Sequence, residues 1–137
     1  MYSIDSFMQR VYKDVNMKIF KGDVLYLGMG PLWLPILQGN KVVTTTIIEI
    51  DQEMIQKYEH YADEDWKIIC ADAWEYVPNK KFDVIYADIW HQMYEYSELE
   101  KMFEKYKDFL KPGGKIYCLE HLVRKNTIPK NKKLSYG

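Results

Sequence analysis

The sequence predicts an α/β fold with a doubly wound, mostly parallel sheet of about five strands in a single domain. Three observations predict it. Short apolar runs alternate with amphipathic helical patterns, which is typical of βαβ units. The first of these runs ends in the glycine turn Gly28-Met29-Gly30, as a buried parallel strand entering a helix often does. The length of 137 residues suits one domain spanning residues 1–137.

The amino-terminal part of the chain predicts a helix, a strand and a second, short helix. Apolar side chains recur at helical spacing from about residue 4 to residue 19, so residues 1–20 should form an amphipathic helix. Lys21-Gly22 ends this pattern, and the apolar run from Asp23 to Leu27 predicts the first strand. Pro31 suits the first turn of the next helix, but Pro35 kinks or shortens it.

The middle of the chain predicts a strand followed by a capped helix. Residues from Val42 to Ile50 are rich in β-branched side chains, which favour strands. Asp51 is the expected cap of a helix, and the apolar face of that helix consists of Met54, Ile55, Tyr58 and Ala62.

Three strands and one helix are expected in the remainder. Trp66 to Cys70 and Phe82 to Ala87 predict the third and fourth strands. A capping box from Ser97 to Glu100 should open the last helix, whose apolar face consists of Leu99, Met102, Phe103 and Tyr106. Lys111-Pro112-Gly113-Gly114 should stop that helix before a fifth strand from Lys115 to Leu119.

Charge and cysteine content narrow the classes of protein. A net charge of −1 supplies no general attraction to phosphates and disfavours nucleic-acid binding, and the basic tail over residues 121–137 is expected to be solvated. Cys70 and Cys118 lie in apolar runs and are expected to be buried, reduced thiols. No run is long enough to cross a membrane and the start is no secretion signal, so a soluble, cytoplasmic protein is predicted.

The fold indicates where a ligand would bind. In a doubly wound sheet, ligands lie beyond the carboxyl ends of the strands, where the winding reverses. Five segments follow the predicted strands and should share that rim: Gly28 to Gly30, Glu49 to Asp51, Asp72 to Trp74, Asp88 to His91, and Glu120 to His121.

These segments carry suitable chemistry, although each also has a plain structural explanation. A dinucleotide fingerprint needs a small residue where this chain has Trp33, so a hydride-transfer enzyme is disfavoured. The carboxylate of Glu49 can accept hydrogen bonds from both hydroxyls of a ribose, or it can be a solvated acid at a strand end. Asp72 can accept from an adenine amino group while Ile50 and Ala73 or Trp74 face the ring, or can simply cap a loop. His91 and His121 lack the spacing of a metal motif, so no metal is expected.

The order of the motifs is more specific than any one of them. Five segments in sequence resemble the class I S-adenosylmethionine-dependent methyltransferases, which have a Rossmann-like fold, and within that superfamily a minimal, truncated version of the spermidine synthase-like branch. They are Asp23 to Gly30, Ile47 to Asp51, Cys70 to Glu75, Phe82 to Asp88, and Leu110 to Gly114.

The resemblance implies S-adenosylmethionine as cofactor and a role for each matching residue. Gly28, Met29 and Gly30 would approach its amino-acid part, Glu49 its ribose, and Asp72 with Ala73 its adenine. Asp88 would take a proton from the attacking group, as a general base does. Trp90, His91 and Tyr94 are candidates for the acceptor side, although such rings can equally belong to a core.

The departures from the family keep three functions open. Pro31 stands where a further glycine is common, and the acceptor motifs of polyamine synthases and of nucleic-acid amino methyltransferases are both missing around Asp88. Methyl transfer to a small-molecule substrate is the preferred interpretation. The alternatives are an aminopropyltransferase that uses decarboxylated cofactor and a non-catalytic cofactor-binding or assembly module. A homo-oligomer is expected because the last strand should expose an apolar edge.

Overall fold

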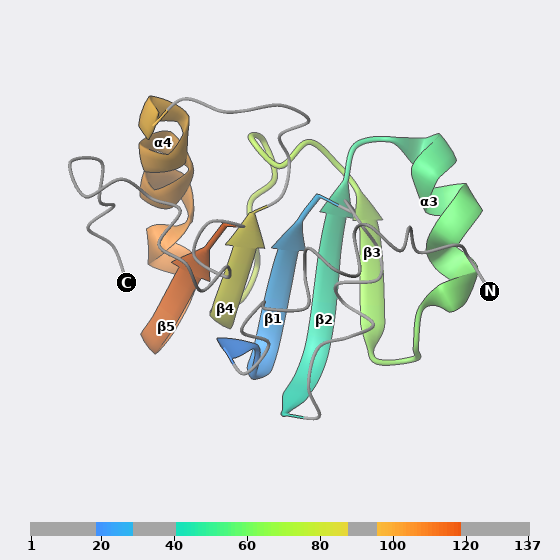
Figure 1. The fold of residues 1–137 in the computed structure, drawn as a ribbon, viewed down its shortest axis with the longest axis horizontal. Coiled ribbons are helices and arrows are strands. Elements are labelled where there is room, and N and C mark those ends of the chain that lie inside the picture. Colours follow the sequence, from blue (N-terminus) through green and yellow to red (C-terminus); the bar gives the residue numbers. More distant parts are fainter. Residues whose placement is uncertain (1–18, 29–40, 88–95, 119–137) are drawn as a thin grey trace, which may run out of the picture.

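The computed structural model describes residues 19–28, 41–87 and 96–118, which form a five-stranded parallel sheet flanked by two helices (Figure 1). The strands are β1 (Gly22–Leu27), β2 (Val42–Glu49), β3 (Trp66–Cys70), β4 (Phe82–Ala87) and β5 (Leu110–Tyr117). The helices are α3 (Gln52–Tyr58) and α4 (Tyr96–Tyr106), each followed by a 3₁₀ turn, Glu59–Tyr61 and Lys107–Phe109. The predicted helices before Ile19 and after Gly30, and the tail after Cys118, lie outside the described residues.

The sheet has the order β3-β2-β1-β4-β5, and all its pairings are parallel. The chain therefore winds outward from β1 to one edge at β3, returns to the other side of β1 at β4, and continues to β5. This reversal beside β1 is the topological switch point of a doubly wound sheet. The predicted fold class is confirmed.

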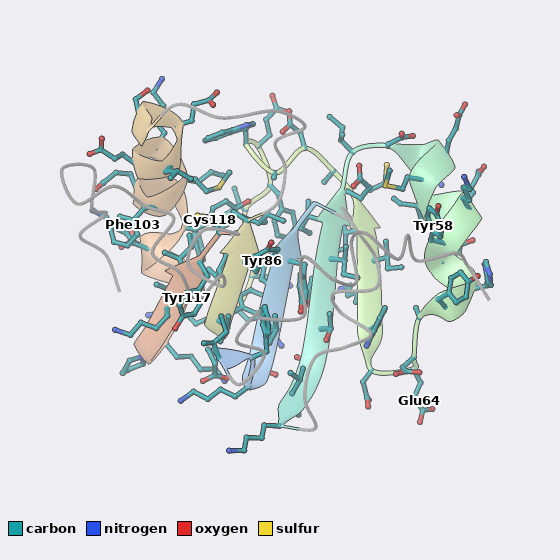
Figure 2. All side chains as sticks on the ribbon, in the orientation of Figure 1. Tyr58, Glu64, Tyr86, Phe103, Tyr117 and Cys118 are labelled. Carbon is teal, nitrogen blue, oxygen red and sulfur yellow. The ribbon has the colours of Figure 1, made fainter. Side chains whose placement is uncertain are left out.

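The side chains of the central strands alternate between two cores. On one face Val24 and Tyr26 of β1 pack in a cluster with Ile55 of α3. On the other face Leu25 and Leu27 pack in a cluster with residues of α4. The two helices therefore cover opposite faces. In Figure 2 they lie toward opposite ends of the row of strands, with Tyr58 on the side of α3 and Phe103 on the side of α4. Burial on both faces explains why β1 reads as a continuous apolar run.

Local sequence signals located most element boundaries. The predicted bounds of β3 and β4 are confirmed, and β1 and β2 differ from the prediction by one residue at one end. Asp51 is the N-cap of α3, because its Oδ1 accepts hydrogen bonds from Glu53 N at 2.9 Å and Met54 N at 3.4 Å. The capping-box prediction for α4 is wrong, because Ser97 lies inside the helix rather than ahead of it.

The predicted start and end of the fifth strand are also wrong. β5 begins at Leu110 and ends at Tyr117, and the Lys-Pro-Gly-Gly segment belongs to it. Leu110 pairs with Phe82 while Lys115 pairs with Val84, so the segment between them forms a bulge opposite a short stretch of β4. Gly113 has φ +81°, a conformation that favours glycine. Proline and glycine therefore interrupt the pairing without ending the strand.

Hydrogen bonds and ion pairs connect four strands at the amino-terminal end of the sheet. Asp83 Oδ2 accepts from Asp23 N at 2.8 Å, and Lys111 Nζ donates to Asp23 Oδ2 at 2.8 Å and to Asp83 Oδ2 at 3.1 Å. Thr44 Oγ1 donates to Asp23 Oδ1 at 2.6 Å. These four residues, which we call the amino-edge cluster, connect β1, β2, β4 and β5 at the end of the sheet opposite the predicted ligand rim.

Within the described ranges, no helix is both long and apolar enough to span a bilayer.

Candidate functional site

The carboxyl ends of β1, β2 and β3 bring three of the predicted segments to one rim. Gly28 follows β1 directly, and its N–H donates to the carbonyl oxygen of Ile48 on β2 at 2.7 Å. The N–H of Ala71, after β3, donates to the carbonyl oxygen of Glu49 at 3.0 Å. The ends of β1 and β3 are therefore each hydrogen-bonded to the end of β2, which lies between them. The predicted gathering of Gly28, Glu49 and Asp72 at this rim follows from the parallel register.

Gly28 needs to be glycine for a backbone reason. Its φ is +99°, which residues with a Cβ rarely adopt. The chain can therefore turn away from the sheet at the end of β1 without a side chain in the way. Met29 and Gly30, which complete the predicted glycine turn, lie outside the described residues.

The carboxylate of Glu49 is held at the entrance to α3. Its Oε2 accepts a hydrogen bond from Asp51 N at 2.9 Å. Ile50, between these two residues, is 65% exposed although it is a large apolar side chain. An acceptor for hydroxyl groups and an exposed apolar surface therefore adjoin each other at the end of β2, as expected for contacts with a sugar and an aromatic ring.

The segment after β3 forms a tight turn organised by Asp72. The carbonyl oxygen of Asp72 accepts from Glu75 N at 3.0 Å and Tyr76 N at 2.8 Å. Its side-chain Oδ1 accepts from Trp74 N at 2.9 Å. Ala73, at the top of the turn, is buried. Asp72 therefore does cap a loop, and this bond engages one of its two carboxylate oxygens.

The described residues contain neither the predicted base nor the predicted acceptor-side residues. Asp88, Trp90, His91 and Tyr94 all lie in the segment 88–95, outside the described ranges. β4 ends at Ala87, immediately before that segment and at the same rim as Gly28. The predicted roles of these four residues stay predictions.

The expectation for Cys70 is wrong, while that for Cys118 is confirmed. Cys118 is buried, but Cys70 is exposed at the end of β3. The reason is the position of β3 at an edge of the sheet, since among the described strands it pairs with β2 alone. The Sγ of Cys70 lies 3.8 Å from the carbonyl oxygen of Ile50, so a thiol adjoins the rim.

Tyr106 is a further residue of this region that sequence reasoning assigned only to the core. Its hydroxyl donates to the carbonyl oxygen of Ala73 at 2.5 Å. Helical periodicity placed Tyr106 on the buried face of its helix. A buried tyrosine hydroxyl usually needs a hydrogen-bond partner, and this was the signal in the sequence that Tyr106 makes such a bond.

The chemistry of this rim is that of recognition by polar acceptors beside apolar surfaces. Two carboxylates, Glu49 and Asp72, can accept from hydroxyl or amino groups. In the described ranges no group of three His, Cys, Asp or Glu side chains could hold a metal ion. The two carboxylates suit a ligand that donates hydrogen bonds from hydroxyl or amino groups.

Comparison with protein families identifies one match, which covers about two thirds of the chain. A family model described as "Methyltransferase domain" matches residues 24–114, which run from β1 into β5. No curated protein matches the sequence at a significant level.

Several solved structures have a similar fold at low sequence identity. A DhpI-SAM-HEP complex has a TM-score of 0.66 and 18% identity over 82% of this chain and 53% of its own. An S-adenosylmethionine-dependent methyltransferase from Clostridium acetobutylicum has a TM-score of 0.58 and 21% identity over 81% and 46%. The glycopeptide N-methyltransferase MtfA has a TM-score of 0.58 and 20% identity over 85% and 53%. The chain therefore spans about half the length of these structures.

Proposed function

The chain belongs to the methyltransferase domain family, and from this membership we propose that it binds S-adenosylmethionine and transfers a methyl group to a small-molecule acceptor. The observation that carries the proposal is the meeting of Gly28, Glu49 and Asp72 at one rim beside the switch point of the sheet. Two structural neighbours are complexes with S-adenosylmethionine (SAM) or S-adenosylhomocysteine (SAH), and they support the choice of cofactor.

The described residues fit this cofactor. Gly28 lets the backbone turn without a side chain, and Glu49 offers a carboxylate to the ribose hydroxyls. Ile50 offers exposed apolar surface to the adenine ring, and Asp72 with Ala73 offers polar atoms to its edge. Met29 and Gly30 complete the proposed set from the sequence.

The reaction needs little from the protein beyond alignment and proton removal. When bound, S-adenosylmethionine supplies an electrophilic methyl carbon on its sulfonium. We assign Asp88 to accept the proton of the acceptor group and Trp90, His91 and Tyr94 to the acceptor side. These assignments rest on the sequence position of all four residues immediately after β4.

Ligand binding to the purified chain tests the proposal. Any ligand that binds only the folded state raises its stability, so S-adenosylmethionine and S-adenosylhomocysteine should raise the midpoint of thermal unfolding. NAD should leave it unchanged. Isothermal titration calorimetry then measures the affinities. No binding of either S-adenosyl compound to the folded chain would overturn the proposal.

The same measurement separates the alternatives. An aminopropyltransferase, which the resemblance to the spermidine synthase-like branch implies, should prefer decarboxylated S-adenosylmethionine to the carboxylated form. A non-catalytic cofactor-binding or assembly module should bind the cofactor yet transfer no tritiated methyl group to any small acceptor supplied. The family model describes a methyltransferase domain, which favours methyl transfer over both.

The cellular setting that goes with this proposal is a cytoplasmic one, with the chain acting as a homo-oligomer. The position of β5 at one edge of the described sheet supports the oligomer, and solution mass tests it.

A further inference from the structure

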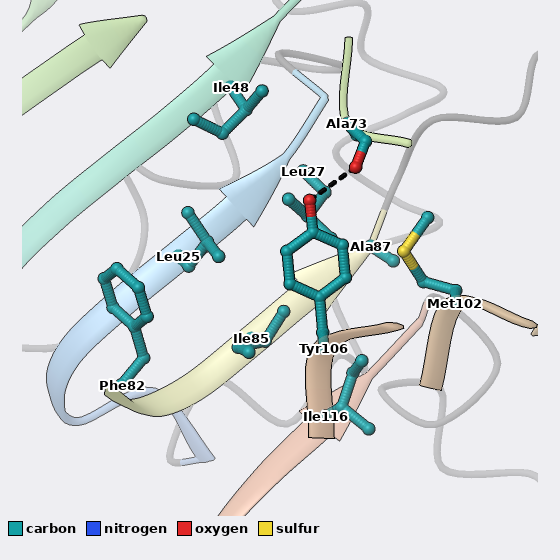
Figure 3. Packing of buried hydrophobic residues seen from close by; sticks show 10 residues of the cluster. All are labelled: Leu25, Leu27, Ile48, Ala73, Phe82, Ile85, Ala87, Met102, Tyr106 and Ile116. Atoms are coloured by element: carbon teal, nitrogen blue, oxygen red, sulfur yellow. Dashed lines mark hydrogen bonds between the residues drawn. The ribbon is translucent and has the colours of Figure 1, made fainter. Parts of the chain in front are cut away.

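The backbone carbonyl of Ala73 forms a hydrogen bond to a residue of α4, which is distant in sequence from the turn. The carbonyl oxygen of Ala73 accepts from the hydroxyl of Tyr106, which lies 33 residues away in sequence at the end of α4 (Figure 3). The N–H groups of Glu75 and Tyr76 go to Asp72 instead. Ala73 is therefore held from outside the turn.

The core determines where the Tyr106 hydroxyl lies. Tyr106 is 0% exposed. Figure 3 shows its ring rising from α4 through the cluster that covers this face of the sheet, with the hydroxyl pointing at the turn. The neighbours in that cluster include Leu25, Leu27, Ile85, Met102 and Ile116. A ring packed on all sides has little freedom to rotate away, so the donor is preorganised.

One peptide group connects this hydroxyl to the carboxylate of Asp72. The carbonyl of Ala73 and the N–H of Trp74 belong to the same planar unit. Tyr106 holds the oxygen of that unit, and Asp72 Oδ1 accepts from its N–H. Rotation of the peptide plane would break both bonds. The orientation of the Asp72 carboxylate is therefore coupled to Tyr106.

Burial, with the nearby Tyr76 and Asp72, keeps the Tyr106 hydroxyl protonated and therefore able to donate. Burial raises the pKa of Tyr106 far above its usual range, and the nearby Tyr76 and Asp72 raise it further. The hydroxyl is therefore protonated at every physiological pH. In the described part of the chain no group donates to Asp72 Oδ2, so that oxygen can accept from a ligand.

We propose that Tyr106 is a positioning residue for base recognition: through the Ala73–Trp74 peptide it orients the Asp72 carboxylate toward the amino group of the cofactor's adenine. This proposal rests on the proposed function. It assigns specificity for an amino-substituted purine to a residue that need not touch the ligand.

The test compares two ligands that differ only at the base. S-inosylhomocysteine carries an oxygen where S-adenosylhomocysteine carries the amino group, and calorimetry gives both affinities. Wild-type protein should prefer the adenosyl ligand. Tyr106→Phe removes one neutral hydrogen bond, so it should weaken adenosyl binding by roughly threefold to tenfold and leave inosyl binding nearly unchanged.

The outcomes separate this inference from the proposed function. If wild-type protein binds neither ligand, the proposed function fails and the inference fails with it. If wild-type protein prefers the adenosyl ligand and Tyr106→Phe keeps the full preference, only the inference is overturned. An equal loss for both ligands indicates a purely structural role and also overturns it.

A matched control removes a hydroxyl from the other core. Tyr86 is a buried tyrosine of β4 that packs with Phe20 and Tyr26 on the opposite face of the sheet. Tyr86→Phe should leave the ratio of the two affinities unchanged. If it lowers that ratio as much as Tyr106→Phe does, the inference is wrong.

Wild-type protein provides a second measurement that does not depend on the folding of a variant. Amide hydrogen exchange at Trp74 reports on the coupled peptide group. The adenosyl ligand should slow this exchange more than the inosyl ligand does at equal saturation. Equal slowing by both would contradict the proposal.

Discussion

At the scale of single residues, the two carboxylates of the site are held by the same device. Glu49 Oε2 accepts from the N–H of Asp51, and Asp72 Oδ1 accepts from the N–H of Trp74, in each case two residues ahead. Such bonds limit the rotamers that a side chain explores before a ligand arrives. The ordering cost of binding is then smaller, which is the physical meaning of preorganisation.

Glu49 should contribute directly to cofactor affinity. Glu49→Ala removes the acceptor proposed for the ribose hydroxyls, and S-adenosylmethionine binding should weaken by about 1.5–3 kcal/mol, as for hydrogen bonds to a charged group. Calorimetry measures the loss. Glu53→Ala, an exposed acid on α3, is the control and should bind normally. Unchanged affinity in folded Glu49→Ala protein would rule out the ribose role.

Asp88 should affect turnover rather than binding. A carboxylate that removes a proton during transfer contributes to the rate, so Asp88→Asn should lower kcat by about 10²-fold and leave cofactor affinity nearly intact. The assay uses any acceptor that the wild-type protein methylates. Asp108→Asn, in the turn after α4, is the matched control. Wild-type turnover in Asp88→Asn would show that this carboxylate is not the base.

At the scale of elements, the bulge in β5 connects the strand to the amino-edge cluster. The bulged segment opposite β4 includes Lys111, whose ammonium bridges Asp23 and Asp83. A regular strand that started at Lys115 would not include Lys111. The proline and glycines that follow Lys111 thus give the segment a shape that supports an ion-paired connection between strands.

This cluster makes stability depend on acid pH. The hydrogen bond from Lys111, followed by that from Thr44, lowers the pKa of Asp23 below its ordinary 3.8. The hydrogen bond from Asp23 N lowers the pKa of Asp83 below the same value. A carboxylate with a depressed folded-state pKa stabilises the fold above its unfolded value, and that contribution is lost as pH falls through the folded value.

Asp83→Ala should therefore cost stability at neutral pH and progressively less below pH 3.8. The expected loss is about 1 kcal/mol, because the lost hydrogen bonds are partly exposed to solvent. Urea unfolding at a series of pH values measures it. Asp108→Ala, whose side chain is exposed and forms none of the hydrogen bonds of the cluster, should show no such pH-dependent difference. A constant difference for Asp83→Ala down to the most acid pH would contradict this account.

At the scale of the whole molecule, β3 and β5 lie at the two edges of the sheet that the described residues form. β3 is short, at five residues. The last three residues of β5, from Lys115 to Tyr117, pair with β4 in regular register beyond the bulge. An edge strand can pair with another chain, and a closed, symmetric dimer is the commonest outcome.

A homo-oligomer therefore remains our expectation for the chain in solution. Light scattering at micromolar concentration should give a mass of at least twice 16.5 kDa. A mass near 16.5 kDa would contradict the prediction.

The sequence by itself determined the fold class, the bounds of β3 and β4 and the cap of α3. These features depend on local patterns, because strand periodicity, β-branched runs and an Asp before a helix act over a few residues. It also determined that Gly28, Glu49 and Asp72 share a rim, since parallel winding places every strand's carboxyl end on the same side.

Only the tertiary structure decided the features that depend on which elements are neighbours. Cys70 is exposed because its strand is at an edge, and β5 starts early because its bulge is matched to β4 and to two aspartates of other strands. The bond from Tyr106 to Ala73 spans 33 residues and arises from packing, which no local pattern encodes. Local signals determine what each segment forms, whereas long-range contacts determine what its side chains touch.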